Sequence, residues 1–196
     1  MHAHPSAPLS LFVADGRRKY LTPDERGRFI ETARRCDRRE LGTLCLMLAF
    51  AGCRISEALA LSGSSIDCAE GVVVIRSLKK RGALMYRQVP LPSALIEEIV
   101  EVHARSECGP EYRLWTLSRS RAWQLVKQVM AKASIASGPH CVPKGLRHGF
   151  GIHALRSGVP INLVQRWLGH ASLETTMIYL DALGQEEREM AQRMWK

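Results

Sequence analysis

The chain of 196 residues lacks an apolar run of about 18 residues, the length that a membrane crossing needs. Its N-terminus has no basic stretch leading into a long apolar segment, so no secretion signal is expected. The six cysteines include no Cys-x-x-Cys pair, and Cys45 and Cys53 fall in an apolar stretch where cysteine acts as a small hydrophobe. These absences argue against a membrane or secreted protein and favour a cytoplasmic one with reduced thiols.

Positive charge is present in excess. Lysine and arginine number 28 against 19 acidic residues, which gives a formal net charge of +9. This balance favours a polyanionic partner. Basic charge alone does not separate nucleic-acid-binding domains from other small basic domains, so the local motifs have to decide.

Residue patterns predict an α+β chain that is mainly helical, with one small antiparallel β-sheet. Thr22 is expected to cap a first helix, with Pro23 in its first turn and Glu25 completing a capping box. Further helices are predicted over 38–51, 55–61, 92–105, 118–134, 143–157, 160–168, 172–180 and 185–195, and strands over 65–68, 72–77 and 84–90.

The chain is expected to divide into an arm and one domain. Residues 1–20 are predicted to form a flexible basic arm that ends in Arg17, Arg18 and Lys19. Residues 21–196 fit a single domain of ordinary size.

The most specific chemical signal is a tyrosine nine residues after a histidine. Tyr179 follows His170 in a segment that begins with Leu168 and Gly169. On one unbroken helix this offset would be about 900° and would place the two side chains on opposite faces. Gly169 and Ser172 indicate a break instead, with Ser172 capping a new short helix, so that both side chains can converge on one point.

Cations stand upstream of this tyrosine at three positions. Arg54 lies in a Gly-x-Arg-x-Ser-Glu segment, and Lys144 and Arg147 are neighbours on one helical face. Lys79 and Lys80 follow an apolar strand, where the tip of a hairpin is expected. Tyrosine is an uncommon nucleophile that needs positive charge around its target, and these residues supply it.

Together, these ordered motifs resemble those of the tyrosine recombinase (phage integrase) family, from about Leu21 to the C-terminus. The resemblance implies that family's catalytic-domain fold, and a site-specific recombinase or integrase that cuts and rejoins duplex DNA through a 3′-phosphotyrosine. The implied catalytic residues are Arg54, Lys79, Lys144, Arg147, His170 and the nucleophile Tyr179, with Glu57 and His148 in support. The expected DNA contacts are Arg17, Arg18, Lys19, Lys80 and Arg81.

Each implied role has a plainer alternative. Arg54 and Arg147 would grip the scissile phosphate with forked, permanently charged groups, although Arg54 could simply pair with Glu57. His170 would bind the phosphate or help to deprotonate Tyr179, and its alternative role is to cap a helix. The alternative for Tyr179 is an ordinary core tyrosine.

A lysine at the hairpin tip would protonate the 5′-oxygen leaving group. Lys79 is preferred to Lys80 by its distance from the preceding strand, and phosphate tracking by all the tip cations is the alternative. Enzymes that use metal ions for this chemistry hold them with carboxylate clusters. No such cluster occurs among the motifs, so a reaction without metal or cofactor is predicted.

The sequence departs from the family pattern in two places, at Lys144 and around Phe150. Lys144 stands where most members carry histidine, and a lysine with an ordinary pKa near 10.4 donates hydrogen bonds rather than accepting a proton. Gly149 and Gly151 flank Phe150 where a small hydroxyl residue often follows His148, and only local packing is expected to change.

Family members commonly carry an additional N-terminal helical domain, in place of which this chain has about twenty residues. The chain resembles the short recombinases that invert fimbrial promoter segments and the single-domain integrases of plasmids and mobile elements. The resemblance implies a homotetramer on two synapsed sites, with a host DNA-bending protein as an additional partner. The alternatives are a DNA-binding regulator that has lost cleavage and a type IB topoisomerase-like nicking and relaxing enzyme.

Overall fold

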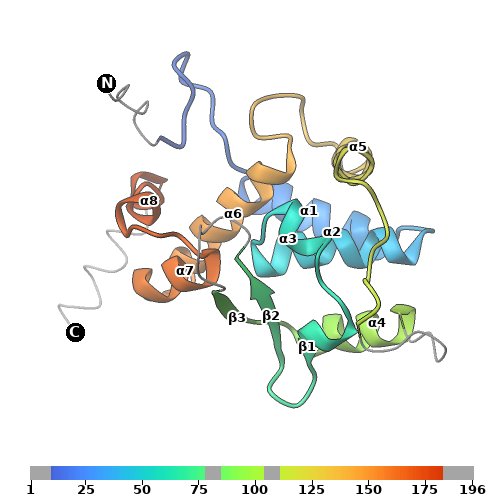
Figure 1. Cartoon of the computed structure of the whole chain (residues 1–196). Coiled ribbons are helices and arrows are strands. Elements are labelled where there is room, and N and C mark those ends of the chain that lie inside the picture. Colours follow the sequence, from blue (N-terminus) through green and yellow to red (C-terminus); the bar gives the residue numbers. More distant parts are fainter. Residues whose placement is uncertain (1–9, 78–84, 104–110, 183–196) are drawn as a thin grey trace, which may run out of the picture.

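The computed structural model describes residues 10–77, 85–103 and 111–182 (Figure 1). In chain order its elements are α1 (Pro23–Arg34), α2 (Arg39–Ala51), α3 (Ile55–Ala58), η1 (Gly63–Ser65), β1 (Ile66–Asp67), β2 (Val72–Arg76), β3 (Tyr86–Pro90), α4 (Ser93–His103), α5 (Arg119–Lys132), α6 (Pro143–Arg156), α7 (Ile161–Leu168), α8 (Glu174–Met177) and η2 (Leu180–Ala182). The predicted helical fold with one small antiparallel sheet is confirmed. None of the helices in the described ranges combines the length and apolar character that a membrane crossing requires.

Three predicted features lie wholly or partly outside the described residues. They are the first nine residues of the arm, the hairpin tip with Lys79, Lys80 and Arg81, and the helix expected over 185–195.

The first helix begins as its sequence predicts. The Thr22 hydroxyl accepts a hydrogen bond from the Glu25 backbone N–H at 3.3 Å, and the Glu25 carboxylate accepts one from the Thr22 N–H at 2.9 Å. This capping box satisfies two donors that the helix cannot pair internally. It also fixes where the chain enters α1.

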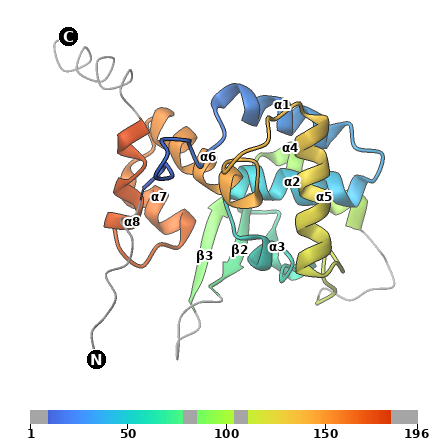
Figure 2. The same ribbon diagram turned by 90° about the horizontal axis from the view of Figure 1, so that it is seen from above.

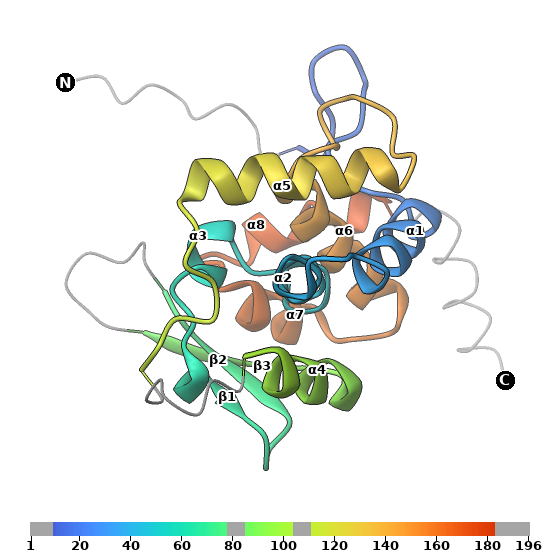
Figure 3. The same cartoon turned by 90° about the vertical axis from the view of Figure 1, so that its right-hand side faces the viewer.

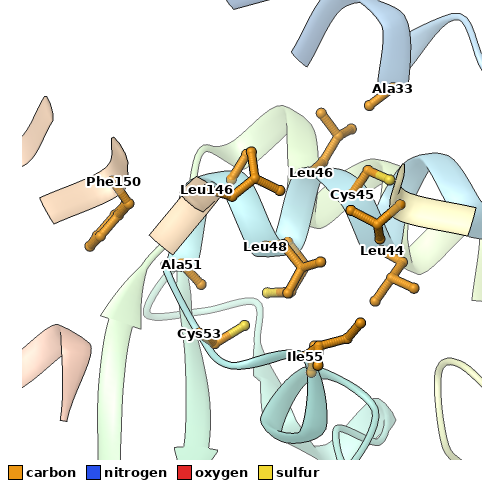
Figure 4. Packing of buried hydrophobic residues seen from close by; sticks show 14 of the residues in the cluster. Ala33, Leu44, Cys45, Leu46, Leu48, Ala51, Cys53, Ile55, Leu146 and Phe150 are labelled. Carbon is orange, nitrogen blue, oxygen red and sulfur yellow. The ribbon is translucent and has the colours of Figure 1, made fainter. Parts of the chain in front are cut away.

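Helix α2 is the centre of the core. Ten of its thirteen residues are buried, because it is apolar on every side and packs against α1, α4 and α6. Figure 3 shows it end on, with α5 above it and the sheet and α4 below. In Figure 4, Leu46 and Leu48 project from opposite sides of the helix, so both faces are buried in apolar surroundings.

The end of α2 directs the chain into the motif that carries Arg54. Gly52 has a φ of 57°, in the left-handed region, and a Cβ built on it would lie 2.3 Å from the Phe150 ring. Glycine is therefore needed both for the turn and for the close approach of α6. The next residues, Cys53 and Arg54, lead into the short helix α3.

The sheet has the order β1-β2-β3, with both pairs antiparallel. Alternation along the last two strands turns Val73, Ile75, Arg87 and Val89 toward the core. Three of these are apolar, and Arg87 pairs across the sheet with Ile75. A buried arginine therefore occupies a position where alternation would place an apolar side chain.

Helices α6, α7 and α8 follow one another and complete the fold; Figure 2 shows α7 and α8 on one side of the molecule and α5 on the other. Helix α7 ends at Gly169, whose φ is 65°, so the predicted break is confirmed. The Ser172 hydroxyl accepts a hydrogen bond from the Glu174 N–H at 3.1 Å, but the helical residues begin two positions after Ser172. The helix expected over 172–180 is a four-residue turn of α-helix followed by η2.

The predicted arm differs from the structure over residues 10–20. Leu11 is fully buried, and its carbonyl accepts a hydrogen bond from the Lys19 N–H at 2.7 Å. Arg18 forms a two-pronged ion pair with the buried Glu25, with both N–O distances at 2.6 Å. The boundary placed at residue 21 therefore cuts through a packed segment, because a buried leucine and an ion pair hold it to the domain.

Replacing Arg18 tests whether this segment is part of the fold. We expect Arg18→Ala to lower the free energy of unfolding by roughly 2–3 kcal/mol, because it leaves the Glu25 carboxylate buried with fewer partners. Arg17→Ala is the matched control, since Arg17 pairs with Asp15 on an exposed surface, and it should leave stability unchanged. Urea denaturation measures both. Equal effects of the two substitutions would contradict the packed arrangement.

Candidate active site

Six residues predicted from the sequence converge on a cleft of about 700 Å³. They are Arg54, Lys144, Arg147, His148, His170 and Tyr179. Helices α5, α6 and α8, together with the start of α3, supply its walls. The arm cations Arg17, Arg18 and Lys19 are not among its lining residues.

Arg54 enters the cleft from the residue that precedes α3. Its Nη1 donates to Glu57 Oε1 at 2.8 Å, and its backbone N–H donates to Glu57 Oε2 at 2.9 Å. The Arg54 side chain is 29% exposed, whereas that of Glu57 is 1% exposed. The ion pair proposed as an alternative for Arg54 is therefore present, and it leaves Arg54 at the cleft surface.

Glu57 remains an anion although it is buried. Burial alone would raise its pKa, but hydrogen bonds and charge from Arg87, followed by Arg54, outweigh burial and lower the pKa. A carboxylate that stays ionised can hold both guanidiniums.

Arg147 lies deeper in the cleft and is 6% exposed. Its Nη1 donates to the Gly52 carbonyl at 2.9 Å and its Nη2 to the Leu168 carbonyl at 2.6 Å. Burial, and then the nearby charge of Arg54, lower its pKa to about 10, which leaves it charged at neutral pH. One guanidinium thus fixes the ends of α2 and α7 relative to α6.

Tyr179 is fully buried at the side of the cleft. Its hydroxyl lies 3.2 Å from Nδ1 of His148. Burial raises its pKa to about 12, so the phenol is neutral at physiological pH. Burial, and then the charges of Lys144 and Arg147, lower the pKa of His148 to about 3, so the imidazole is neutral as well.

His170 also packs against the tyrosine. Its ring stacks on the Tyr179 ring with centroids 6.2 Å apart, and Nδ1 lies 2.9 Å from the Thr176 hydroxyl. Burial, and then the charge of Arg147, lower its pKa to about 3. Thr176 therefore orients an uncharged imidazole beside the tyrosine.

Lys144 lies at the exposed rim of the cleft, on the first turn of α6. Helix α5 contributes Arg119 and the exposed Trp123 to the cleft, and Lys127 Nζ lies over the Trp123 ring, 5.6 Å from its centroid. Sequence reasoning missed this basic, aromatic face of α5. The signal that could have found this face is the four-residue spacing of Arg119, Trp123 and Lys127 on a helix that the sequence predicts.

Gly151 has a larger role than the expected local packing. A Cβ built on it would lie 2.6 Å from the Tyr179 ring. The absence of a side chain on this turn of α6 therefore makes room for the tyrosine. Of the two glycines that flank Phe150, Gly151 is therefore the one that packs against the proposed nucleophile.

Sequence reasoning also missed Arg87, which donates to both oxygens of Glu57. A charged residue at an inward position of a predicted strand was the signal that could have found it. Among residues 10–77, 85–103 and 111–182, no three His, Cys, Asp or Glu side chains gather as a metal-binding group.

The family model described as "Phage integrase family" matches residues 19–186, and the chain belongs to this family. The chain is 37% identical over 145 residues to tyrosine recombinase XerA of Thermococcus kodakarensis, covering 69% of this chain and 49% of that protein. It is 33% identical over 157 residues to tyrosine recombinase XerD of Mycobacterium leprae, covering 74% and 48% respectively. The chain thus spans about half the length of these relatives.

The fold is similar to that in a crystal structure of XerA recombinase. The TM-score is 0.73 at 28% sequence identity, over 89% of this chain and 64% of that one. The fold is therefore that of a tyrosine recombinase catalytic domain.

Gly151→Ala tests the contact with Tyr179. Alanine is intrinsically about 1 kcal/mol better than glycine inside a helix, but here its Cβ should displace the tyrosine ring and lower the melting temperature. The matched control is Gly27→Ala in α1, where a Cβ meets no atom within 4 Å and the melting temperature should rise. Thermal unfolding of both variants gives the comparison. A stabilised Gly151→Ala variant would contradict the packing described.

Acid titration tests the burial of His148. Its folded pKa of about 3 lies below the unfolded value near 6.5, so the unfolded chain binds more protons between these pH values. The free energy of unfolding should therefore fall as the pH drops, by about 2 kcal/mol between pH 7 and pH 5 from this residue. His148→Gln should have a correspondingly flatter pH dependence in urea denaturation. An unchanged slope would show that His148 can be protonated in the folded chain.

Proposed function

We propose that this chain is a site-specific DNA recombinase that cuts and rejoins duplex DNA through a 3′-phosphotyrosine on Tyr179. One observation carries the proposal. Arg54, Arg147, His170 and Tyr179 come from separate segments of the chain and line one cleft. Membership of the phage integrase family and the similarity to tyrosine recombinases support it.

The cations of the cleft suit a phosphodiester. Arg54 and Arg147 would bind the non-bridging oxygens and stabilise the negative charge that develops on them. Lys144 at the rim would add a third donor. Because each guanidinium is already held by protein acceptors, little reorganisation is needed when the phosphate arrives.

In the cleavage step the Tyr179 oxygen attacks phosphorus and the bond from phosphorus to the 5′-oxygen breaks. The phenol proton goes to a neutral imidazole, either His148 at 3.2 Å or His170, which stacks on the ring. The departing 5′-oxygen takes a proton from a lysine and becomes a hydroxyl. Rejoining reverses the step, with a 5′-hydroxyl attacking the phosphotyrosine and releasing Tyr179.

In this proposal a lysine of the hairpin tip that contains Lys79, Lys80 and Arg81 donates the proton to the 5′-oxygen. Lys79 is preferred, with Lys80 as the alternative and Arg81 as a phosphate contact. Neither metal nor cofactor has a part in the proposed reaction.

Duplex DNA would extend from the cleft over the outer face of α5. Arg119, Trp123 and Lys127 offer two cations and an exposed aromatic ring next to the catalytic groups. Arg17 and Lys19 would add phosphate contacts beyond the cleft.

Recombination between two sites requires four strands to be cut, so we propose a homotetramer on synapsed DNA, in the nucleoid of the cell. A host DNA-bending protein would assist assembly. Two alternative functions can be distinguished from this one by experiment. The first is a DNA-binding regulator that does not cut, and the second is a type IB topoisomerase-like enzyme that relaxes DNA without joining two duplexes.

Tyr179→Phe is the direct test of the nucleophile. It removes one hydroxyl, and we expect it to abolish covalent attachment to a nicked suicide substrate while DNA binding stays nearly unchanged. Mass spectrometry of the wild-type adduct should locate the DNA on Tyr179. Tyr86→Phe and Tyr112→Phe are matched controls at exposed tyrosines and should keep wild-type attachment.

Each alternative has its own outcome in the same assay. Specific binding with no adduct from the wild-type chain would identify a regulator. Relaxation of supercoiled plasmid without recombinant joints would identify the topoisomerase-like enzyme. An adduct that survives in Tyr179→Phe would refute the assignment of the nucleophile.

A further inference from the structure

Among the residues that the structure describes, Arg87 is the most deeply buried cation near the cleft that the proposed reaction does not use. It lies on β3, is 8% exposed, and faces inward opposite Ile75. A buried charge is costly unless it is paired and hydrogen-bonded, so its partners indicate why it is there.

All three guanidinium nitrogens of Arg87 have partners. Nη2 donates to Glu57 Oε2 at 2.7 Å, and Nη1 makes a longer contact with Glu57 Oε1 at 3.4 Å. Nε donates to the Trp167 carbonyl at 2.7 Å. One side chain therefore joins β3 to α3 and to the last turn of α7.

The Glu57 end of this link leads to Arg54. The two carboxylate oxygens that accept from Arg87 also accept from the side chain and the backbone N–H of Arg54. Glu57 is thus held between two guanidiniums. A movement of its carboxylate would change the position of Arg54 in the cleft.

The α7 end of the link leads to His170. Trp167 and Leu168 give their carbonyls to Arg87 and Arg147 respectively. The next residue, Gly169, lies against Arg87, since a Cβ built on it would be 3.1 Å from Nη1. His170 follows directly, so the guanidinium of Arg87 supports the turn that presents it.

We propose that Arg87 is a positioning residue for strand cleavage, which sets Arg54 and His170 relative to each other without contacting DNA. The inference rests on the proposed function of the cleft. It goes further because it assigns a role in cleavage to a residue that does not line the cleft. Arg87 acts through Glu57 on one side and through the α7 terminus on the other.

A purely structural ion pair is the competing explanation, and it predicts that cleavage follows stability. We therefore propose to measure thermal stability, affinity for a nicked duplex and the single-turnover rate of adduct formation in the full chain. Arg87→Met should lower the cleavage rate by about a hundredfold, the effect expected for a small misplacement of catalytic groups, with DNA affinity unchanged. Arg87→Lys keeps the charge but lacks the fork that reaches both partners, so it should recover stability more than cleavage.

Arg26→Met is the matched control. Arg26 is also partly buried and donates to a backbone carbonyl, that of Ala49, but it lies on α1 and does not line the cleft. Its loss should lower stability and leave the cleavage rate of the folded chain unchanged.

A double-mutant cycle with Arg54→Ala tests the link itself. If Arg87 acts partly through Arg54, removing Arg87 should reduce cleavage less in the Arg54→Ala background than in the wild type.

Two outcomes would overturn the positioning role. One is an Arg87→Lys variant in which the cleavage rate recovers together with stability, and the other is a cycle in which the reductions in cleavage rate from the two substitutions simply multiply. A wild-type chain that forms no adduct would refute the proposed function itself, and the inference with it. Wild-type cleavage that Arg87→Met retains would refute the inference alone.

Discussion

The structure around the cleft depends on how buried positive charge is offset. Arg54, Arg87 and Arg147 carry three positive charges, and Glu57, ionised and almost fully buried, carries one negative charge among them. This group of four therefore has a net charge of +2. A phosphodiester is complementary to such a group, because it brings a negative charge and several acceptor oxygens to cations that are already in place.

Backbone carbonyls offset the remaining cost of burial. Arg147 donates to Gly52 and Leu168, and Arg87 donates to Trp167. These carbonyls stand at the C-terminal ends of α2 and α7, where helices leave acceptors unpaired and carry partial negative charge. The same contacts that stabilise the arginines also hold the helix ends in place. The charge arrangement and the tertiary arrangement are thus one set of interactions.

Local signals explain what could be predicted from the sequence. The capping box at Thr22, the break at Gly169 and the spacing from His170 to Tyr179 are readable because each depends on neighbouring residues. The role of Arg87 was not readable, since its partners lie 30 and 80 positions away along the chain. The packing of residues 10–20 was missed for a different reason: composition indicated a solvated basic arm, whereas a buried leucine and an ion pair from Arg18 to Glu25 hold it.

The fully buried tyrosine imposes a final condition on the chemistry. In the described structure Tyr179, His148 and His170 are all neutral, and burial has moved the pKa of the phenol upward and those of the imidazoles downward. Both shifts oppose transfer of the phenol proton to an imidazole. A phosphate beside Arg54 and Arg147 would offset cations that lower the pKa of His170 and that of the Tyr179 phenol alike, so it would make the imidazole a better proton acceptor and the phenol a weaker acid. The charge of the phosphate alone therefore does not drive the proton transfer, which becomes favourable only as part of the attack, when the Tyr179 oxygen bonds to phosphorus as its proton leaves.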